Sequence, residues 1–177
     1  MVGSEDARLV ILRGNGASGK SSVAAGLRKR FGRGPALVGQ DDLHRIVLRE
    51  RDRPGAANIG LIDVTARYAR DGGFHGVVEG SLCASRYGDM LAQLLADHRG
   101  VTHGYYLHVP LRETLVRHPT KPIAVDVNGA QLRDWCRELH LLPGGIETVI
   151  GAHSARHETV DRIMVDTALA HLPATDR

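Results

Sequence analysis

A glycine-rich loop between a strand and a helix constrains this chain most. Residues 14–21 read GNGASGKS and match G-x-x-x-x-G-K-[ST] at every defined position. The run LVIL at 9–12 predicts a strand that is buried on both faces. After the loop, Val23, Leu27 and Phe31 recur at every fourth position and predict a helix that ends at a GRG sequence. A strand, this loop and a helix in succession are the context in which the motif binds phosphate.

The residue types of the loop explain why it suits phosphate. Gly14, Gly16 and Gly19 allow positive φ and close approach of the backbone, so we expect successive N–H groups to converge on a β-phosphate at the helix N-terminus. Lys20 is expected to reach the β- and γ-phosphates, and the Ser21 hydroxyl to take one Mg²⁺ position. The predicted nucleotide-binding residues are Gly14, Asn15, Gly16, Ala17, Ser18, Gly19, Lys20, Ser21 and Ser22. The alternative, a flexible linker that happens to precede Lys-Ser, does not account for the flanking strand and helix.

Strand and helix patterns alternate along the rest of the chain. The further predicted strands cover 36–40, 75–79, 102–109 and 146–150. A closing helix is expected at 155–170, although the RIMVD sequence within it also fits a strand. This alternation predicts an α/β fold of three layers, a parallel sheet between helices, with its ligand site at the carboxyl ends of the strands.

The helices between these strands have recognisable apolar faces. In the first, Leu61, Val64 and Tyr68 are expected to lie on one face. The apolar face of the next comprises Tyr87, Leu91, Leu94 or Leu95, and His98. The charged segment from Asp41 to Arg53 is expected to be helical and to stop at Pro54.

Composition bounds the class of protein. With 177 residues, 42% apolar and 24% charged, and no internal repeat, the chain is expected to form one domain over 1–177. Its N-terminus lacks an apolar signal region, and no apolar run approaches the roughly 20 residues that cross a bilayer. We therefore expect a soluble cytoplasmic protein that does not associate with a membrane. The net charge of +3 suits a phosphate site but does not favour a nucleic-acid partner. Cys83 and Cys136 are expected to be reduced thiols, and oligomeric state is left open.

Carboxylates follow two of the predicted strands. Asp41 and Asp42 come directly after 36–40, where a carboxylate can accept the proton of a hydroxyl that attacks the γ-phosphate. Capping of the next helix explains only one of the two. Glu79 ends another strand and can hold Mg²⁺ through water. We therefore predict Asp41 as the general base and Ser21 with Glu79 as the metal site. Asp41 and Glu79 could also exchange these two roles.

An aperiodic segment follows the fourth strand. Residues 119–130 are rich in turn formers and lie within a predicted helical lid at about 117–137. Phosphoryl transfer needs positive charge over the γ-phosphate and exclusion of water. Arg117 before this segment and Arg133 after it are therefore predicted to be catalytic together with Lys20.

The phosphate acceptor is expected beyond the second and third strands. The predicted substrate contacts are Asp42, Arg45, Ser81 and Arg86. Further candidates are His44, Asn58 and Tyr87. Solvated helix surface is the simpler interpretation of the charged run from Arg49 to Asp52.

Taken together, these motifs resemble the P-loop kinases of the nucleoside-monophosphate-kinase-like group. GNGASGKSS, VGQDDL and VVEGS, followed by an arginine-bearing flap, are most similar to the branch of polynucleotide 5′-kinase domains, chloramphenicol phosphotransferase, gluconate kinase and zeta-toxin-type kinases. The resemblance covers about the first 140 residues in outline, and only the loop is highly specific. It implies a five-stranded parallel sheet of order 2-3-1-4-5, an aspartate base at Asp41, and lid arginines at Arg117 and Arg133.

The leading hypothesis is a kinase that uses ATP and Mg²⁺ to phosphorylate a hydroxyl of a small molecule, such as a sugar, a nucleoside or an antibiotic. One alternative is a 5′-hydroxyl polynucleotide kinase, which the mild charge weakens. Another is a nucleotide-binding regulatory protein with little turnover. A GTPase switch is disfavoured because Ile123 stands where a guanine-reading motif needs aspartate.

Overall fold

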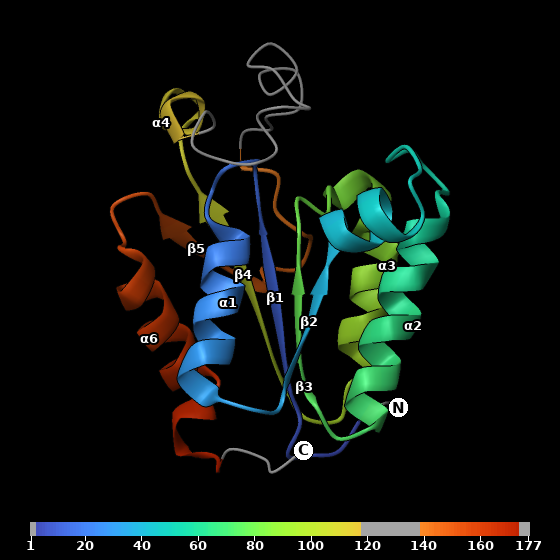
Figure 1. Ribbon diagram of the computed structural model, residues 1–177, viewed down its shortest axis with the longest axis vertical. Helices are drawn as coiled ribbons and strands as arrows, with labels where there is room; N and C mark the ends of the chain where they lie inside the picture. Colours follow the sequence, from blue (N-terminus) through green and yellow to red (C-terminus); the bar gives the residue numbers. More distant parts are fainter. Residues whose placement is uncertain (1–2, 118–138, 174–177) are drawn as a thin grey trace.

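Strand β1 (Arg8–Gly14) lies at the centre of a parallel sheet in the computed structural model, which describes residues 3–117 and 139–173 (Figure 1). The other strands are β2 (Pro35–Gly39), β3 (His75–Glu79), β4 (Val101–His108) and β5 (Glu147–Gly151). Their order across the sheet is β2-β3-β1-β4-β5. The predicted fold class and strand order are confirmed.

The helices cover both faces of this sheet. They are α1 (Lys20–Phe31), α2 (Ala57–Asp71), α3 (Ala84–Asp97), α4 (Leu111–Arg117) and α6 (Arg156–Asp166). Two shorter turns are η1 (Asp42–Val47) and η4 (Leu169–His171). Figure 1 shows α1 and α6 over one face and α2 and α3 over the other. Of the described helices, none is both long and apolar enough to cross a membrane.

Both faces of β1 are buried, which explains its uninterrupted apolar sequence. Val10 and Leu12 pack in the core under α1 and α6, whereas Leu9 and Ile11 pack in the core under α2 and α3. A central strand of a parallel sheet has no solvent face, so alternation of apolar and polar residues is lost. At the other extreme, β2 is an edge strand and can begin with Pro35, which has no N–H to donate.

The buried face of α2 is not the one that carries Val64 and Tyr68. Leu61, Val64 and Tyr68 do share one side of the helix, but Val64 is 57% exposed and Tyr68 is 82% exposed. The residues of α2 that are buried are Asn58, Ile62, Ala66 and Arg70. Two of these four are polar, so the true inner face does not read as an apolar stripe.

Two predicted helices are shorter in the structure. The segment after β2 keeps helical turns only through Val47, and residues 49–53 then run without regular structure to α2. The closing helix ends at Asp166 because Ala168 adopts a left-handed conformation with φ of 56°. The RIMVD sequence is helical. The predicted flap at 119–130 lies outside the described residues.

Two helical glycines give a paired test of the packing. A Cβ on Gly26 of α1 would lie 2.7 Å from Val160 Cγ2 of α6, whereas one on Gly60 of α2 would meet no heavy atom within 4 Å. We expect Gly26→Val to lower the free energy of unfolding by about 1–3 kcal/mol through overpacking. Gly60→Ala is expected to raise it by about 0.5–1 kcal/mol through helix propensity. Urea denaturation measures both, and a stabilised Gly26→Val would contradict the close α1–α6 contact.

Candidate active site

The glycine-rich loop forms an open cradle at the N-terminus of α1. Its positive φ angles are at Gly14 (146°), Ala17 (57°) and Gly19 (99°), so the left-handed position expected at Gly16 falls on Ala17. A Cβ on Gly14 would lie 2.5 Å from Leu107 O of β4, which excludes any side chain there. A Cβ on Gly19, the residue before α1, would meet nothing within 4 Å. The loop therefore has open space at Gly19, at the positive end of the helix dipole, and the N–H of Ser18 donates to Asn15 O at 3.3 Å within the turn.

Lys20 lies buried within this cradle. Its Nζ donates to Asn15 O at 2.8 Å and to Ser18 Oγ at 3.3 Å. Burial lowers the pKa of Lys20, and the negative charges of Glu79 and Asp41 only partly oppose that shift. The ammonium group thus occupies the loop interior with backbone and hydroxyl oxygens as its partners. A stronger acceptor, such as a phosphate oxygen, would compete for the same donor.

Ser21 and Glu79 meet between α1 and β3. Ser21 Oγ donates to Glu79 Oε1 at 2.9 Å. Burial raises the pKa of Glu79, and Asp41 and Asp42 add to the shift, while Lys20 and the Ser21 hydroxyl oppose it. The parallel register places Glu79 opposite Leu12 of β1 on one side and Gly39 of β2 on the other. Glu79 is therefore held at the carboxyl edge of the sheet, between the ends of β1 and β2.

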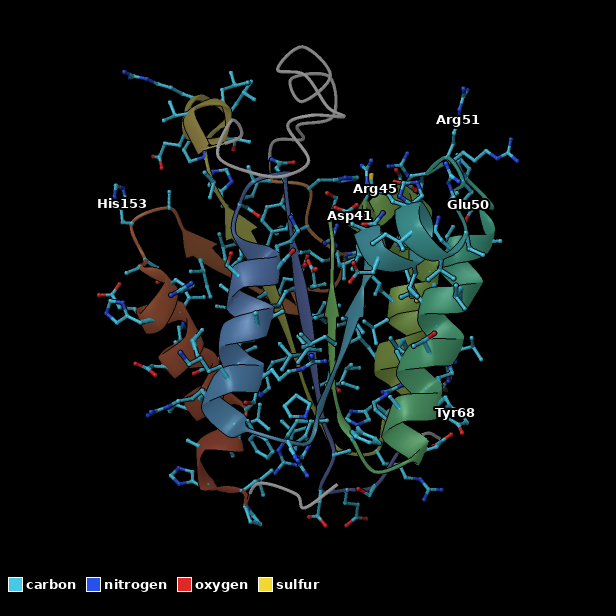
Figure 2. All side chains as sticks on the ribbon, viewed as in Figure 1. Asp41, Arg45, Glu50, Arg51, Tyr68 and His153 are labelled. Carbon is cyan, nitrogen blue, oxygen red and sulfur yellow. The ribbon has the colours of Figure 1, made fainter. Side chains whose placement is uncertain are left out.

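The two aspartates after β2 have different surroundings. A Cβ on Gly39 would lie 2.8 Å from Asp42 Oδ2 and 3.4 Å from Glu79 Oε1, so Asp42 lies over the end of β2 beside Glu79. Asp41 instead accepts a hydrogen bond from Arg45 Nε at 3.0 Å, and its side chain is 64% exposed. Figure 2 shows Asp41 and Arg45 close together at the carboxyl edge of the sheet. The structure thus gathers Asp41, Asp42 and Glu79 near Lys20.

A buried ion pair supports the cradle from below. Arg13, one residue before the loop, is 1% exposed, and its Nη1 lies 2.7 Å from Glu147 Oε2 of β5. Its remaining donors bond Leu82 O at 2.8 Å and His140 O at 3.0 Å. The guanidinium also lies 5.7 Å from the centre of the Tyr106 ring. One side chain therefore joins β1 to β5, to the loop after β3 and to the segment before β5.

On the other side of the site, a polar network fixes the loop that follows η1. The Tyr87 hydroxyl donates to Asp52 Oδ1 at 2.6 Å and accepts from Gln40 Nε2 at 2.9 Å. Burial and the Asp52 carboxylate raise the pKa of Tyr87, so the phenol stays protonated. Gln40 Oε1 in turn accepts from the N–H of Leu82 at 2.9 Å. This network therefore joins the residue after β2, the loop after η1 and the loop after β3 to α3.

A cavity of about 500 Å³ opens beside the cradle. It lies between the loop, the ends of β4 and β5, and the start of α6. Its lining includes Ala17, Gly19, Leu107, Ile150, Arg156 and His157. The sequence did not predict the residues contributed by β5 and α6, because only the pairing of β5 with β4 brings them beside the loop.

The remaining predicted site residues lie in several different parts of the chain. Arg86 pairs with Asp52 at 3.0 Å, and Ser81 is exposed in the loop after β3. Arg117 is the last residue of α4. Arg133 lies outside the described residues. In the described part of the chain, no three His, Cys, Asp or Glu side chains are grouped as metal ligands.

Comparison of the whole chain with known proteins places its architecture. No family model matches the sequence, and no curated protein matches it. A sugar kinase from Janibacter sp. HTCC2649 superposes with a TM-score of 0.65 at 19% identity, covering 93% of this chain and 97% of that chain. The chain has the fold of the P-loop kinases. The predicted resemblance to the nucleoside-monophosphate-kinase-like group is confirmed at the level of fold.

Two further P-loop kinase structures agree with this assignment. A gluconokinase from Sinorhizobium meliloti 1021 has a TM-score of 0.66 at 15% identity, covering 95% of this chain and 94% of that one. An APS kinase from Mycobacterium tuberculosis, in complex with AMPPNP and APS, has a TM-score of 0.66 at 16% identity, covering 94% and 98%. In such folds the ligands bind at the carboxyl ends of the strands, which is where the cradle and the three carboxylates lie.

Removing one partner of the buried Arg13–Glu147 pair tests its contribution to this P-loop fold. Both side chains are 1% exposed. We expect Glu147→Gln to lower the free energy of unfolding by about 3–5 kcal/mol, because it leaves the Arg13 charge buried without a counter-charge. The double variant Arg13→Met/Glu147→Gln should lose less free energy of unfolding than Glu147→Gln alone, because it leaves no unpaired charge buried. Guanidinium denaturation measures both, and a loss below about 1 kcal/mol for Glu147→Gln would contradict this interpretation.

Proposed function

We propose that this chain, acting as a single domain over residues 1–177, is a kinase that uses ATP and Mg²⁺ to phosphorylate a hydroxyl of a small molecule. The observation that carries the proposal is the contact of Ser21 with Glu79 beside a buried Lys20, with Asp41 and Asp42 at the next strand end. These are the groups that phosphoryl transfer requires, placed at one edge of the sheet. The structural neighbours include a sugar kinase and a gluconokinase, which supports an acceptor of low molecular mass.

The cradle and its neighbouring cavity would hold the nucleotide. Backbone N–H groups of residues 15–21 would bind the β-phosphate, and Lys20 would exchange Asn15 O for a phosphate oxygen. The cavity bounded by Leu107, Ile150 and the start of α6 lies beside the loop and is large enough for a nucleoside. The APS kinase with bound AMPPNP supports ATP as the donor.

Ser21 and Glu79 fit a magnesium ion. Mg²⁺ prefers oxygen ligands and in phosphoryl-transfer sites takes one or two from the protein and the rest from phosphates and water. A hydroxyl and a carboxylate oxygen 2.9 Å apart at the cradle mouth provide such ligands. The ion would neutralise charge on the phosphates during transfer.

Asp41 is the proposed general base. Glu79 is engaged with Ser21, and Asp42 lies over the end of β2, whereas the Asp41 side chain is 64% exposed and accepts a hydrogen bond from Arg45 Nε. It would accept the acceptor's hydroxyl proton as that oxygen attacks the γ-phosphate. Arg117 and Arg133 are proposed to supply positive charge from a lid at about 117–137, as the sequence suggests.

Replacement of the base tests the assignment. Asp41→Asn should lower kcat for transfer of γ-phosphate to the acceptor by about 10²–10⁴-fold, because the amide cannot take the proton. The measurement is acceptor-stimulated ADP release over a panel of sugars, nucleosides and antibiotics. Asp42→Asn is the matched control, and its kcat should fall less than that of Asp41→Asn. A larger loss for Asp42→Asn would move the base to that residue, and no loss in either variant would contradict aspartate catalysis.

Lys20 offers a test of nucleotide binding that does not need the acceptor. Burial disfavours its charged form, so Lys20→Met is expected to leave the unliganded protein at least as stable as the parent. The variant should lose the rise in melting temperature that Mg²⁺–ATP gives the parent protein, because Kd rises by about tenfold or more. Lys29→Met, an exposed lysine of the same helix, is the control and should keep the shift. A full shift in Lys20→Met would contradict the cradle assignment.

A further inference from the structure

A second buried arginine lies at the opposite edge of the sheet from the candidate active site. Arg70, in the last turn of α2, is fully buried. Its aliphatic stem lies on β3, where a Cβ on Gly76 would be 3.5 Å from Arg70 Cδ. Gly76 is the second residue of β3, so Arg70 packs near the amino edge of the sheet. Figure 2 shows Tyr68, two residues earlier on α2, at the end of that helix that lies away from Asp41.

The Arg70 guanidinium has more donors than acceptors around it. Its Nε donates to Ala66 O at 3.1 Å. In the part of the chain that the structure describes, Nη1 and Nη2 have no hydrogen-bond partner, although both atoms are buried. Arg13, which is also buried, instead donates through all three of its nitrogens. A buried charged group without acceptors is unfavourable, so these two donors of Arg70 point to a ligand.

The carboxylates near Arg70 are bonded to other groups. Asp63 and Asp97 both pair with Arg67, at 2.8 Å and 2.7 Å. Asp71 Oδ1 accepts from a backbone N–H of the N-terminal segment at 2.9 Å. Burial and the charge of Arg67 lower the pKa of Arg70, and the three carboxylates oppose this shift only in part. A water molecule would accept from Nη1 or Nη2 but would bring no counter-charge, whereas an anion brings both.

His98, which follows α3, adds a further buried nitrogen. A Cβ on Gly3 would lie 3.3 Å from Arg70 Cβ and 3.5 Å from His98 Cδ2, so both side chains pack around that residue. His98 Nδ1 pairs with Thr102 Oγ1 at 2.7 Å, and Nε2 is buried without a partner among the described residues. Burial and the charges of Arg70 and Arg8 lower the pKa of His98 to about 4, so the ring is neutral near pH 7. When the threonine hydroxyl donates to Nδ1, the ring proton is on Nε2, which is then a third buried donor.

We infer that Arg70 Nη1 and Nη2 bind a small monovalent anion of the halide class, such as chloride, at the amino edge of the sheet beside the neutral His98 ring. The ion would accept both hydrogen bonds and balance the buried charge. Its size follows from the burial of both nitrogens, because a larger anion would have to displace the side chains packed around them. The site lies at the opposite edge of the sheet from the cradle, so the inference does not depend on the proposed kinase function.

Thermal unfolding in two sodium salts tests the site without any nucleotide. Replacing gluconate by chloride at fixed ionic strength leaves the screening of surface charges unchanged, and gluconate is too large for the site. The melting temperature of the parent should rise with chloride, by about 3–5 °C at ten times the chloride Kd. In Arg70→Met it should be the same in both salts. The control Arg28→Gln removes one exposed charge of α1 and should keep the full rise. No rise in the parent, or an equal rise in Arg70→Met, overturns the inference.

A second experiment locates the ion and does not require Arg70→Met to fold. Crystals of the parent protein are grown in sodium bromide, and the anomalous scattering of bromine is measured. We expect a bromide peak within hydrogen-bond distance of Arg70 Nη1 and Nη2. Water alone at these two nitrogens overturns the inference. A peak there without a chloride-dependent rise in the melting temperature of the parent shows an adventitious ion only, and it overturns the inference as well.

Discussion

The guanidinium of Arg13 is the interaction on which the site depends. It is buried at the end of the central strand, directly before the glycine-rich loop, and it is paired with Glu147 from a strand more than 130 residues later. Because its other donors bond Leu82 O and His140 O, it also joins the loop after β3 and the segment before β5 to the end of β1. A charge in this position is tolerated only when every donor has a partner, so the four segments must come together as a unit.

The parallel strands position the other side chains of the site. Their carboxyl ends lie on one edge, and the register sets Glu79 between Leu12 and Gly39. From that position Glu79 meets Ser21 at the start of α1 and shares its surroundings with Asp42. Residues that are far apart in sequence thereby form one cluster of a lysine, a hydroxyl and three carboxylates. The raised pKa of Glu79 and the lowered pKa of Lys20 both arise first from burial, and each charge limits the shift of the other.

The parts of the structure predictable from sequence are those encoded locally. The loop, the strand before it and the helix after it carry their own signature, and the strand order followed from the family resemblance. The inner face of α2 was not predictable in this way, because two of its buried residues, Asn58 and Arg70, are polar, and Asn58 finds its partner in the Tyr87 hydroxyl of α3. Likewise, nothing in the sequence links Arg13 to Glu147, and the run after η1 reads as solvated surface until Glu50 is seen on the N-terminus of α2.

The most direct test of the account is a crystal structure with a non-hydrolysable ATP analogue and Mg²⁺. The account predicts the β-phosphate against the backbone N–H groups of residues 15–21. Lys20 Nζ should have moved from Asn15 O to a phosphate oxygen, with the metal at Ser21 and Glu79. A nucleotide bound elsewhere, or a Lys20 still bonded to Asn15 O beside an empty loop at saturating nucleotide, would contradict it.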